Sequence, residues 1–179
     1  MHHRILSNIG INSSSVKLPS DLEGIDGLII PGGESTTISL LMDSFKLREP
    51  IKNFSKSKPV MGTCAGLILM ANNVLDKKVI PLSLLDITIK RNAYGKQLDS
   101  TTEMVEFNFN PSLAIKLPAT LIRAPKITKV SKKMNILGEI NGSPIAVLSD
   151  MYLGLSFHPE LNNIGSYRWH DELFEWNTA

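Results

Sequence analysis

The sequence of 179 residues contains one cysteine, Cys64, and no long hydrophobic run. A single cysteine excludes an internal disulfide framework and suits a reducing compartment. No apolar run approaches the roughly 20 residues that are needed to cross a bilayer. The opening Met-His-His-Arg-Ile-Leu also lacks the apolar core of a signal peptide. These absences argue against a disulfide-stapled secreted protein and against a helical membrane protein, so we expect a cytoplasmic protein.

The net charge is small as well. A formal charge of +2 gives no reason to expect binding to nucleic acid or to an anionic membrane surface. The hydrophobic content of 42% and the charged content of 20% are those of an ordinary globular protein. No repeat, low-complexity tract or linker interrupts the chain, and its length suits a single domain, residues 1–179. One cysteine and scattered histidines offer no zinc-ligand spacing, so we expect no metal and no cofactor.

Strand and helix patterns alternate in the first half of the chain. We expect strands at 15–18, 28–30 and 59–61, and helices at 3–11, 35–45, 49–55 and 65–71. This alternation is typical of βαβ units and a parallel sheet. In the second half we expect strands at 86–90, 103–107, 119–123, 126–130, 134–140, 144–149 and 152–157, then a closing helix at 165–176. Because little helical pattern separates these strands, they predict a mixed or antiparallel extension of the sheet.

Cys64 lies between two glycines in Gly62-Thr-Cys-Ala-Gly66. A short apolar strand pattern precedes this frame and a helical pattern follows it. A sharp strand-to-helix turn with a nucleophile at its apex is the elbow of many hydrolases, and glycines relieve the crowding around it. The N-terminal amides of the following helix favour a thiolate. The frame predicts a cysteine nucleophile, and the alternative is a small buried hydrophobic residue.

A second group, His158-Pro159-Glu160, follows the last predicted strand. Residues two apart on an extended segment point to the same face, and Pro159 discourages a helix. Functional groups gather at the carboxyl ends of parallel strands, so His158 and Glu160 can complete a Cys–His–acid set with Cys64. Without that cysteine, a structural histidine and a solvated loop acid would be the favoured explanation of the two residues. The other three histidines lack a comparable setting. His2 and His3 are terminal, and His170 lies on a polar helix face.

A third group, Pro31-Gly32-Gly33-Glu34, follows the predicted strand at 28–30. Two glycines allow backbone amides to approach a ligand and to stabilise an oxyanion. The group is not a phosphate-binding loop, because the sequence contains no Gly-x-x-x-x-Gly-Lys-Ser/Thr motif. Arg91 and Arg123 are each able to bind a carboxylate with two hydrogen bonds. Taken singly, the glycines mark only a strand-to-helix turn, and the arginines are ordinary.

Together these motifs resemble those of the class I glutamine amidotransferases. They are Pro-Gly-Gly-Glu-Ser-Thr at 31–36, Gly-Thr-Cys-Ala-Gly-Leu-Ile-Leu at 62–69, Ile-Arg-Ala-Pro at 122–125 and Ser-Phe-His-Pro-Glu-Leu at 156–161. With Asp-Ile-Thr-Ile-Lys-Arg-Asn at 86–92, they resemble more narrowly the glutaminase subunits of pyridoxal 5′-phosphate synthase, the vitamin B6 branch. The resemblance runs in order from the first helix to the last. It implies an α/β three-layer sandwich with a mostly parallel central sheet and a mixed or antiparallel extension.

The resemblance also implies an activity and a role for each matching residue. Cys64 would be the nucleophile, His158 the acid and base, and Glu160 its orienting partner, with an oxyanion hole near Gly33 and Ala65. L-Glutamine would be hydrolysed to L-glutamate and ammonia through a cysteinyl thioester. The ammonia would pass to the synthase subunit of a hetero-oligomeric complex, and this chain would bind no pyridoxal phosphate. The glutamine site would comprise Gly32, Gly33, Glu34, Arg91, Ile122 and Arg123.

One feature departs from the family. Its members begin with a buried strand and a Leu-Gln-Gly loop before the first helix, whereas this sequence opens at what resembles that helix. We therefore expect the N-terminal strand of the sheet to be missing. Three functions stay open: a glutaminase for vitamin B6 synthesis, a glutaminase for another acceptor of the imidazole glycerol phosphate synthase type, and an N-terminally truncated, non-catalytic subunit that only binds its partner.

Overall fold

The computed structural model describes residues 1–91, 100–110, 112–162 and 166–175. Its main sheet has five strands in the order β1-β2-β10-β9-β8. These are β1 (Leu28–Ile30), β2 (Val60–Thr63), β10 (Tyr152–Leu155), β9 (Ser143–Ser149) and β8 (Asn135–Ile140). β2 pairs in parallel with β1 and β10, whereas β9 is antiparallel to β10 and β8. The predicted parallel sheet with an antiparallel extension is confirmed.

The three parallel strands end at one edge of this sheet. Ile30 is in register with Gly62, and Thr63 is in register with Leu155. The segments that follow β1, β2 and β10 therefore leave the sheet side by side, at the edge where functional groups gather in parallel sheets. They carry the predicted site residues Gly32, Cys64 and His158.

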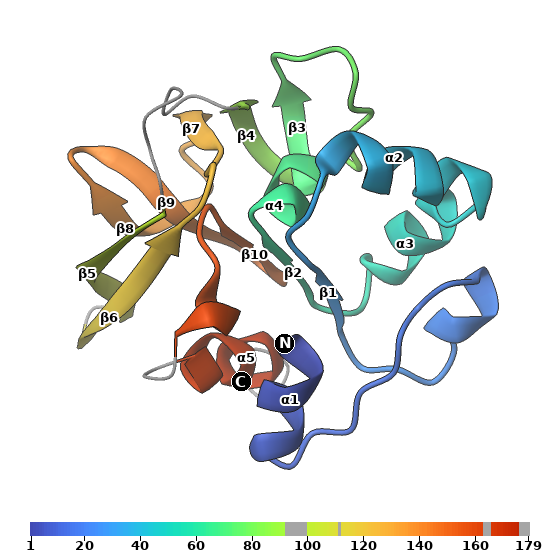
Figure 1. The fold of residues 1–179 in the computed structure, drawn as a ribbon, viewed down its shortest axis with the longest axis horizontal. Helices are drawn as coiled ribbons and strands as arrows, with labels where there is room; N and C mark the ends of the chain where they lie inside the picture. Colours follow the sequence, from blue (N-terminus) through green and yellow to red (C-terminus); the bar gives the residue numbers. More distant parts are fainter. Residues whose placement is uncertain (92–99, 111, 163–165, 176–179) are drawn as a thin grey trace.

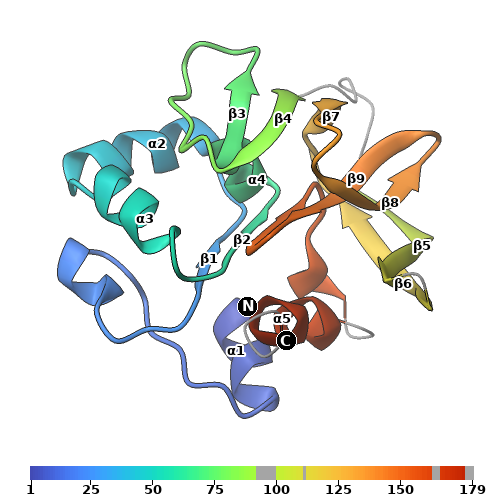
Figure 2. The ribbon, with the colours of Figure 1, turned by 180° about the vertical axis from the view of Figure 1, so that it is seen from behind.

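Alternate residues of β2 enter two hydrophobic cores. Val60 packs with residues of helices α2 (Ser35–Ser44), α3 (Arg48–Phe54) and α4 (Ala65–Met70). Met61 packs with residues of β5 (Thr101–Asn110) and β6 (Leu113–Leu121), and with Trp169 of α5 (Ser166–Glu175). Successive side chains of a strand point to opposite faces, so the two cores cover two faces and make three layers. In Figures 1 and 2, α2 and α3 lie on the opposite side of β1 and β2 from β5 and β6.

Two smaller sheets complete the fold. β4 (Leu85–Lys90) is parallel to β3 (Ala71–Val74) and antiparallel to β7 (Lys126–Val130), and β5 is antiparallel to β6. β3 was not predicted from the sequence, because Asn72 and Asn73 are residues that strands usually avoid. The sequence also predicts a polar loop at 91–97, which lies outside the described residues beyond Arg91.

The predicted strand at 15–18 is wrong. The backbone N–H groups of Lys17 and Leu18 both donate to Oδ2 of Asp21 at 2.8 Å. A 3-10 turn, η1 (Pro19–Leu22), begins directly afterwards. The aspartate carboxylate satisfies the amides that a neighbouring strand would otherwise bind, so the local turn replaces the ladder.

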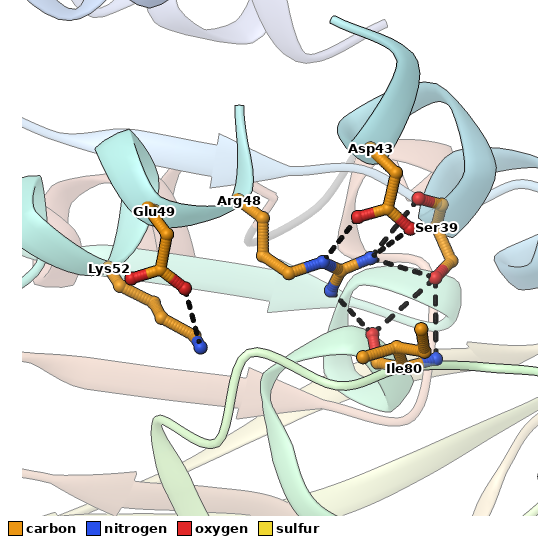
Figure 3. Close-up of polar contacts among 6 residues, drawn as sticks. All are labelled: Ser39, Asp43, Arg48, Glu49, Lys52 and Ile80. Carbon is orange, nitrogen blue, oxygen red and sulfur yellow. Dashed lines mark hydrogen bonds and ion pairs between the residues drawn. The ribbon is translucent and has the colours of Figure 1, made fainter. Parts of the chain in front are cut away.

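One arginine ties α2, α3 and the loop before β4 together (Figure 3). Arg48 Nε donates to Asp43 Oδ1 at 2.7 Å, and its Nη1 donates to the carbonyl oxygen of Ile80 at 2.6 Å. Its Nη2 also donates to Ser39 Oγ at 3.1 Å. The Arg48 side chain is only 12% exposed, although its partner Asp43 is 45% exposed. The loop between β3 and β4, which carries Asp76, is therefore fixed against the helices.

Helices α1 (His2–Asn8) and α5 lie next to each other, so the first and last described elements meet (Figure 1). This contact brings side chains from opposite ends of the sequence to the same place. None of the helices in the described ranges is long and apolar enough to cross a membrane.

The outer edge of β1 has no strand partner among the described residues, because β1 ends the five-stranded sheet. An open, mostly apolar cavity of about 1200 Å³ lies beside it. The cavity is bordered by α1, residues 11–17, β1 and the α2 side chains Ile38 and Met42. The sheet has room for a further strand at this edge, and the expectation of a missing N-terminal strand stays a prediction.

Candidate active site

Cys64 occupies a sharp turn between β2 and α4, as its sequence frame predicted. Its φ of 49° and ψ of −101° lie outside the regions that residues with a side chain ordinarily adopt. The Cys64 N–H donates to the carbonyl oxygen of Leu155 at 2.8 Å and ties the turn to β10. The thiol points toward the carbonyl oxygen of Ile122, with Sγ 3.9 Å from it. Such backbone strain is concentrated at functional sites, which favours a nucleophile over a small core residue.

The two glycines of the elbow permit close packing around this turn. A β-carbon on Gly66 would overlap the carbonyl oxygen of Ile30, and one on Gly62 would stand 2.6 Å from the Gly66 carbonyl carbon and from Met70 Sδ. No side chain fits at either position unless the backbone moves. The crowding that the Gly-x-Cys-x-Gly frame predicted is therefore present in the structure.

His158 and Glu160 form the second part of the site. Nδ1 of His158 lies 2.8 Å from Oε1 of Glu160, and the His158 N–H donates to the carbonyl oxygen of Thr120 at 2.9 Å. The pairing agrees with the prediction, but the predicted extended segment is wrong, because Pro159 begins a 3-10 turn, η2 (Pro159–Leu161). The fixed φ of proline suits the first position of a helical turn, where its missing N–H is not needed.

The electrostatics of this pair favour its charged forms. Burial acts to lower the pKa of His158, but hydrogen bonding with Cys64 and Glu160 outweighs burial and raises that pKa to about 10. Burial likewise acts to raise the pKa of Glu160, yet the hydrogen bond from His158 leaves it lowered. Each partner therefore stabilises the charge of the other. The imidazole interacts with both the thiol and the carboxylate, as a Cys–His–acid set requires.

The two glycines after β1 have different settings. A β-carbon on Gly32 would overlap Cε1 of His158 and stand 3.0 Å from its Nδ1. Gly33 has a φ of 149°, which residues with a side chain rarely adopt. Gly32 thus makes room for the imidazole, a role that the sequence did not suggest. The expected role of both glycines in glutamine binding stays a prediction.

Glu34 and Arg91 lie together at the start of α2. The Glu34 carboxylate accepts hydrogen bonds from the N–H groups of Thr36 and Thr37 at 3.0 and 2.6 Å, and these bonds lower its pKa to about 2. Arg91 Nη2 donates to Glu34 Oε1 at 3.2 Å, and its Nη1 donates to Asp76 Oδ2 at 2.9 Å. Two carboxylates therefore hold the guanidinium in place. A role for Asp76 was not predicted from the sequence.

The remaining predicted residues border Cys64. The Ile122 carbonyl oxygen faces the thiol, and Ala65 directly follows Cys64 as the first residue of α4, so its N–H is one of the amides without a helical partner. Arg123 has an exposed side chain and a φ of 47°. It makes no hydrogen bond or ion pair within the part of the chain that the structure describes. The structure thus brings every predicted site residue to the carboxyl edge of the sheet or to the segments beside it, and it leaves Arg123 unengaged there.

Two histidines that the sequence had set aside lie behind Glu160. Nε2 of His2 is 3.6 Å from Oε2 of Glu160, and Nδ1 of His2 is 2.9 Å from Nε2 of His170. His170 was expected on a polar helix face, but it is fully buried. The prediction was wrong because α1 covers that part of α5. No local pattern could have revealed a contact between residues 168 positions apart.

A strained cysteine at a strand-to-helix elbow, with a histidine–carboxylate pair at the same edge of an α/β sheet, defines a thiol-dependent site of the glutamine amidotransferase class. The profile of the SNO glutamine amidotransferase family matches residues 1–176. The chain belongs to this family. The predicted class of enzyme and the predicted family are therefore confirmed.

Relatives and solved structures agree with this assignment. Three relatives bear the name pyridoxal 5′-phosphate synthase subunit PdxT. The relative from Oenococcus oeni is 42% identical over 170 residues, 95% of this chain and 86% of that protein. Those from Shouchella clausii and Methanocaldococcus jannaschii are each 41% identical, over 90% and 92% of this chain and 82% and 85% of their own lengths. A crystal structure of a glutamine amidotransferase superposes with a TM-score of 0.89 at 30% identity, over 99% of this chain and 93% of that one. PurLQS from Thermotoga maritima, with a TM-score of 0.69 at 18% identity over 98% and 91% of the two chains, shares the fold alone.

Proposed function

We propose that this chain is the glutaminase subunit of a pyridoxal 5′-phosphate synthase, and that it hydrolyses L-glutamine to L-glutamate and ammonia at Cys64. The observation that carries this proposal is the elbow cysteine together with an imidazole that lies 2.8 Å from a buried carboxylate. The names of the relatives support the vitamin B6 branch.

The residues suggest a two-stage mechanism. The Cys64 thiolate, paired with the protonated His158, attacks the side-chain amide carbon of glutamine. Amides near Gly33 and Ala65 stabilise the oxyanion, and His158 protonates the departing ammonia to leave a thioester. Water then attacks the thioester as His158 accepts its proton, which releases glutamate and regenerates the thiolate beside the protonated imidazole. Glu160 orients the imidazole and stabilises its charged form throughout.

The glutamine backbone needs partners for both of its charges. The Glu34 carboxylate, whose pKa is lowered to about 2 by its hydrogen bonds, suits the ammonium group. Arg123, unengaged in the described chain beside Cys64, suits the carboxylate, and Arg91 holds Glu34 in place. The proposed glutamine site comprises Gly32, Gly33, Glu34, Arg91, Ile122 and Arg123.

The ammonia passes to a separate synthase subunit, which uses it with a pentose phosphate and a triose phosphate to make pyridoxal 5′-phosphate. We therefore propose a hetero-oligomeric complex in which this chain contributes one domain, residues 1–179, and needs no cofactor of its own. The single cysteine must stay reduced, which suits the cytoplasm.

A glutaminase assay tests the proposal directly. Glutamate formed from glutamine is measured with and without the synthase subunit, for the unaltered protein and for Cys64→Ala. We expect formation that requires Cys64 and increases when the synthase subunit is present. No glutamate at any concentration of the partner would contradict the proposal and favour a non-catalytic binding subunit. Isolation of the bound partner tests the branch, since a cyclase of the imidazole glycerol phosphate type would contradict the vitamin B6 assignment.

A further inference from the structure

The two oxygens of the Glu160 carboxylate have different environments. Oε1 is 2.8 Å from His158 Nδ1. Oε2 is buried and has no hydrogen-bond partner within the described ranges, and the same holds for Nε2 of His2. These two atoms face each other at 3.6 Å, which is too long for a hydrogen bond and too short for a bridging water. A buried carboxylate oxygen without a donor requires an explanation.

The tautomer of His2 explains why this carboxylate oxygen has no donor. His170 Nδ1 lies 2.7 Å from the carbonyl oxygen of Ser166, which can only accept, so this nitrogen carries the hydrogen. In the neutral ring, Nε2 of His170 is then an acceptor, and it accepts from Nδ1–H of His2 at 2.9 Å. The other nitrogen of His2, Nε2, is therefore left with a lone pair that faces Oε2 of Glu160.

Both rings are neutral at physiological pH. Burial lowers the pKa of His2 to about 4 against the opposing pull of Glu160, with the amino terminus of Met1, His158 and His170 acting in the same direction as burial. Burial also lowers the pKa of His170, although its bond to Ser166 and the charges of Glu160 and Asp171 act to raise it. Neutral rings keep the tautomer that the hydrogen bonds define.

We propose that His2, fixed in its Nδ1–H tautomer by His170, is a positioning residue that withholds a second hydrogen bond from Glu160 and so keeps the carboxylate directed at His158. A carboxylate oxygen without a donor leaves more of the charge for the donor at the other oxygen, because each added hydrogen bond stabilises and disperses the charge. A donor or a water at Oε2 would weaken the hold of Glu160 on the imidazolium. The inference rests on the proposed function, since it takes Glu160 as the acid of the triad.

Two variants introduce the missing donor by different routes. His2→Gln places an amide N–H near Oε2, and His170→Phe removes the acceptor that fixes the His2 tautomer, so that His2 Nε2–H becomes free to donate. In both variants the basic limb of the kcat/KM profile for glutamine should move to lower pH by roughly half a unit or more. The KM at neutral pH should stay close to that of the unaltered protein. The assay uses the complex with the synthase subunit and measures glutamate.

His3→Gln is the matched control. His3 is the next residue of α1, it is exposed, and its ring bonds to Ser13 and Ser15 rather than to the site. The kcat/KM profile of the His3→Gln variant should coincide with that of the unaltered protein. Basic limbs that do not move, or that move to higher pH, in both His2→Gln and His170→Phe would overturn the inference.

Nuclear magnetic resonance of the ring nitrogens tests the tautomer without any activity. We expect His2 to carry its hydrogen on Nδ1 at neutral pH, and a hydrogen on Nε2 would overturn the inference even in a fully active enzyme. An active Cys64→Ala variant, or an unaltered complex that forms no glutamate, would instead contradict the proposed function. The two failures are therefore distinguishable.

Discussion

Gly32 lies so close to the His158 imidazole that a β-carbon at position 32 would overlap Cε1 of the ring. The backbone that leaves β1 thus forms a surface against which the imidazole rests. A single added methyl group is enough to displace the ring from the thiol and the carboxylate, because the overlap is with a ring atom rather than with the end of a flexible chain.

We therefore expect Gly32→Ala to lower kcat by about two orders of magnitude, the usual contribution of a positioned acid or base. The melting temperature should also fall somewhat, because the displaced imidazole loses its pairing with Glu160. Gly142→Ala is a useful contrast, since a β-carbon there meets open space but the φ of 70° disfavours it. That variant should lose stability and keep its activity. A Gly32→Ala enzyme with nearly unchanged kcat would contradict the assigned position of His158.

The raised pKa of His158 makes a prediction about stability and pH. Because the pKa in the folded protein, about 10, exceeds the ordinary value of 6.5, the pairing stabilises the fold fully below pH 6.5 and is lost as the pH rises through about 10. The difference in free energy of unfolding between the unaltered protein and Glu160→Gln should therefore shrink across this window. Urea unfolding at several pH values measures it. A difference that is independent of pH would argue against the pair.

The lowered pKa of Glu34 leads us to expect the opposite dependence of stability on pH. Its pKa is lowered from 4.5 to about 2 by the amides of Thr36 and Thr37, so its charge stabilises the fold above pH 4.5 and this contribution is lost as the pH falls through about 2. Glu34→Gln should lower the melting temperature at neutral pH, and the deficit should close as the solution is acidified. Glu23→Gln, at an exposed position outside the site, is the control and should show no such deficit.

The sequence predicted the reactive residues of the site better than the residues that hold them in place. The elbow at Cys64 and the His158–Glu160 pair depend on short segments whose glycines and proline restrict the backbone locally, so the pattern is visible in the chain. The predicted extended segment at 158–160 failed because Pro159 is compatible with both an extended chain and the first position of a 3-10 turn. Local sequence alone did not distinguish the two.

Long-range contacts account for most of what the sequence did not reveal. His2 meets His170 across 168 positions, and Asp76 meets Arg91 only because a loop is fixed against α2 by Arg48. Such contacts arise when elements pack, and no periodicity within a single element encodes them.

Arg48 provides a test of that packing. It makes charge-assisted hydrogen bonds to Asp43 and a bond to the carbonyl oxygen of Ile80 while only 12% exposed (Figure 3). Arg48→Met should lower the free energy of unfolding by about 1 kcal/mol, since it removes the donor shared by the buried Ser39 Oγ and the more exposed oxygens of Asp43 and Ile80. Lys52→Met is the matched control. Within the described residues, Lys52 bonds only to the well-exposed Glu49, so its replacement should cost less than about 0.5 kcal/mol. Equal losses in urea unfolding would show that Arg48 has no special role.

Arg91 tests the proposed glutamine site. One guanidinium reaches Glu34 through Nη2 and Asp76 through Nη1, a geometry that the single ammonium of lysine does not reproduce. Arg91→Lys should therefore let Glu34 shift and raise the KM for glutamine roughly tenfold, which corresponds to about 1.4 kcal/mol of binding, with little change in kcat. The exposed Arg4→Lys on α1 should leave both constants unaltered. If Arg91→Lys lowered kcat and spared KM, Arg91 would act on the chemical step instead, because a residue that only holds the substrate contributes equally to the ground state and the transition state.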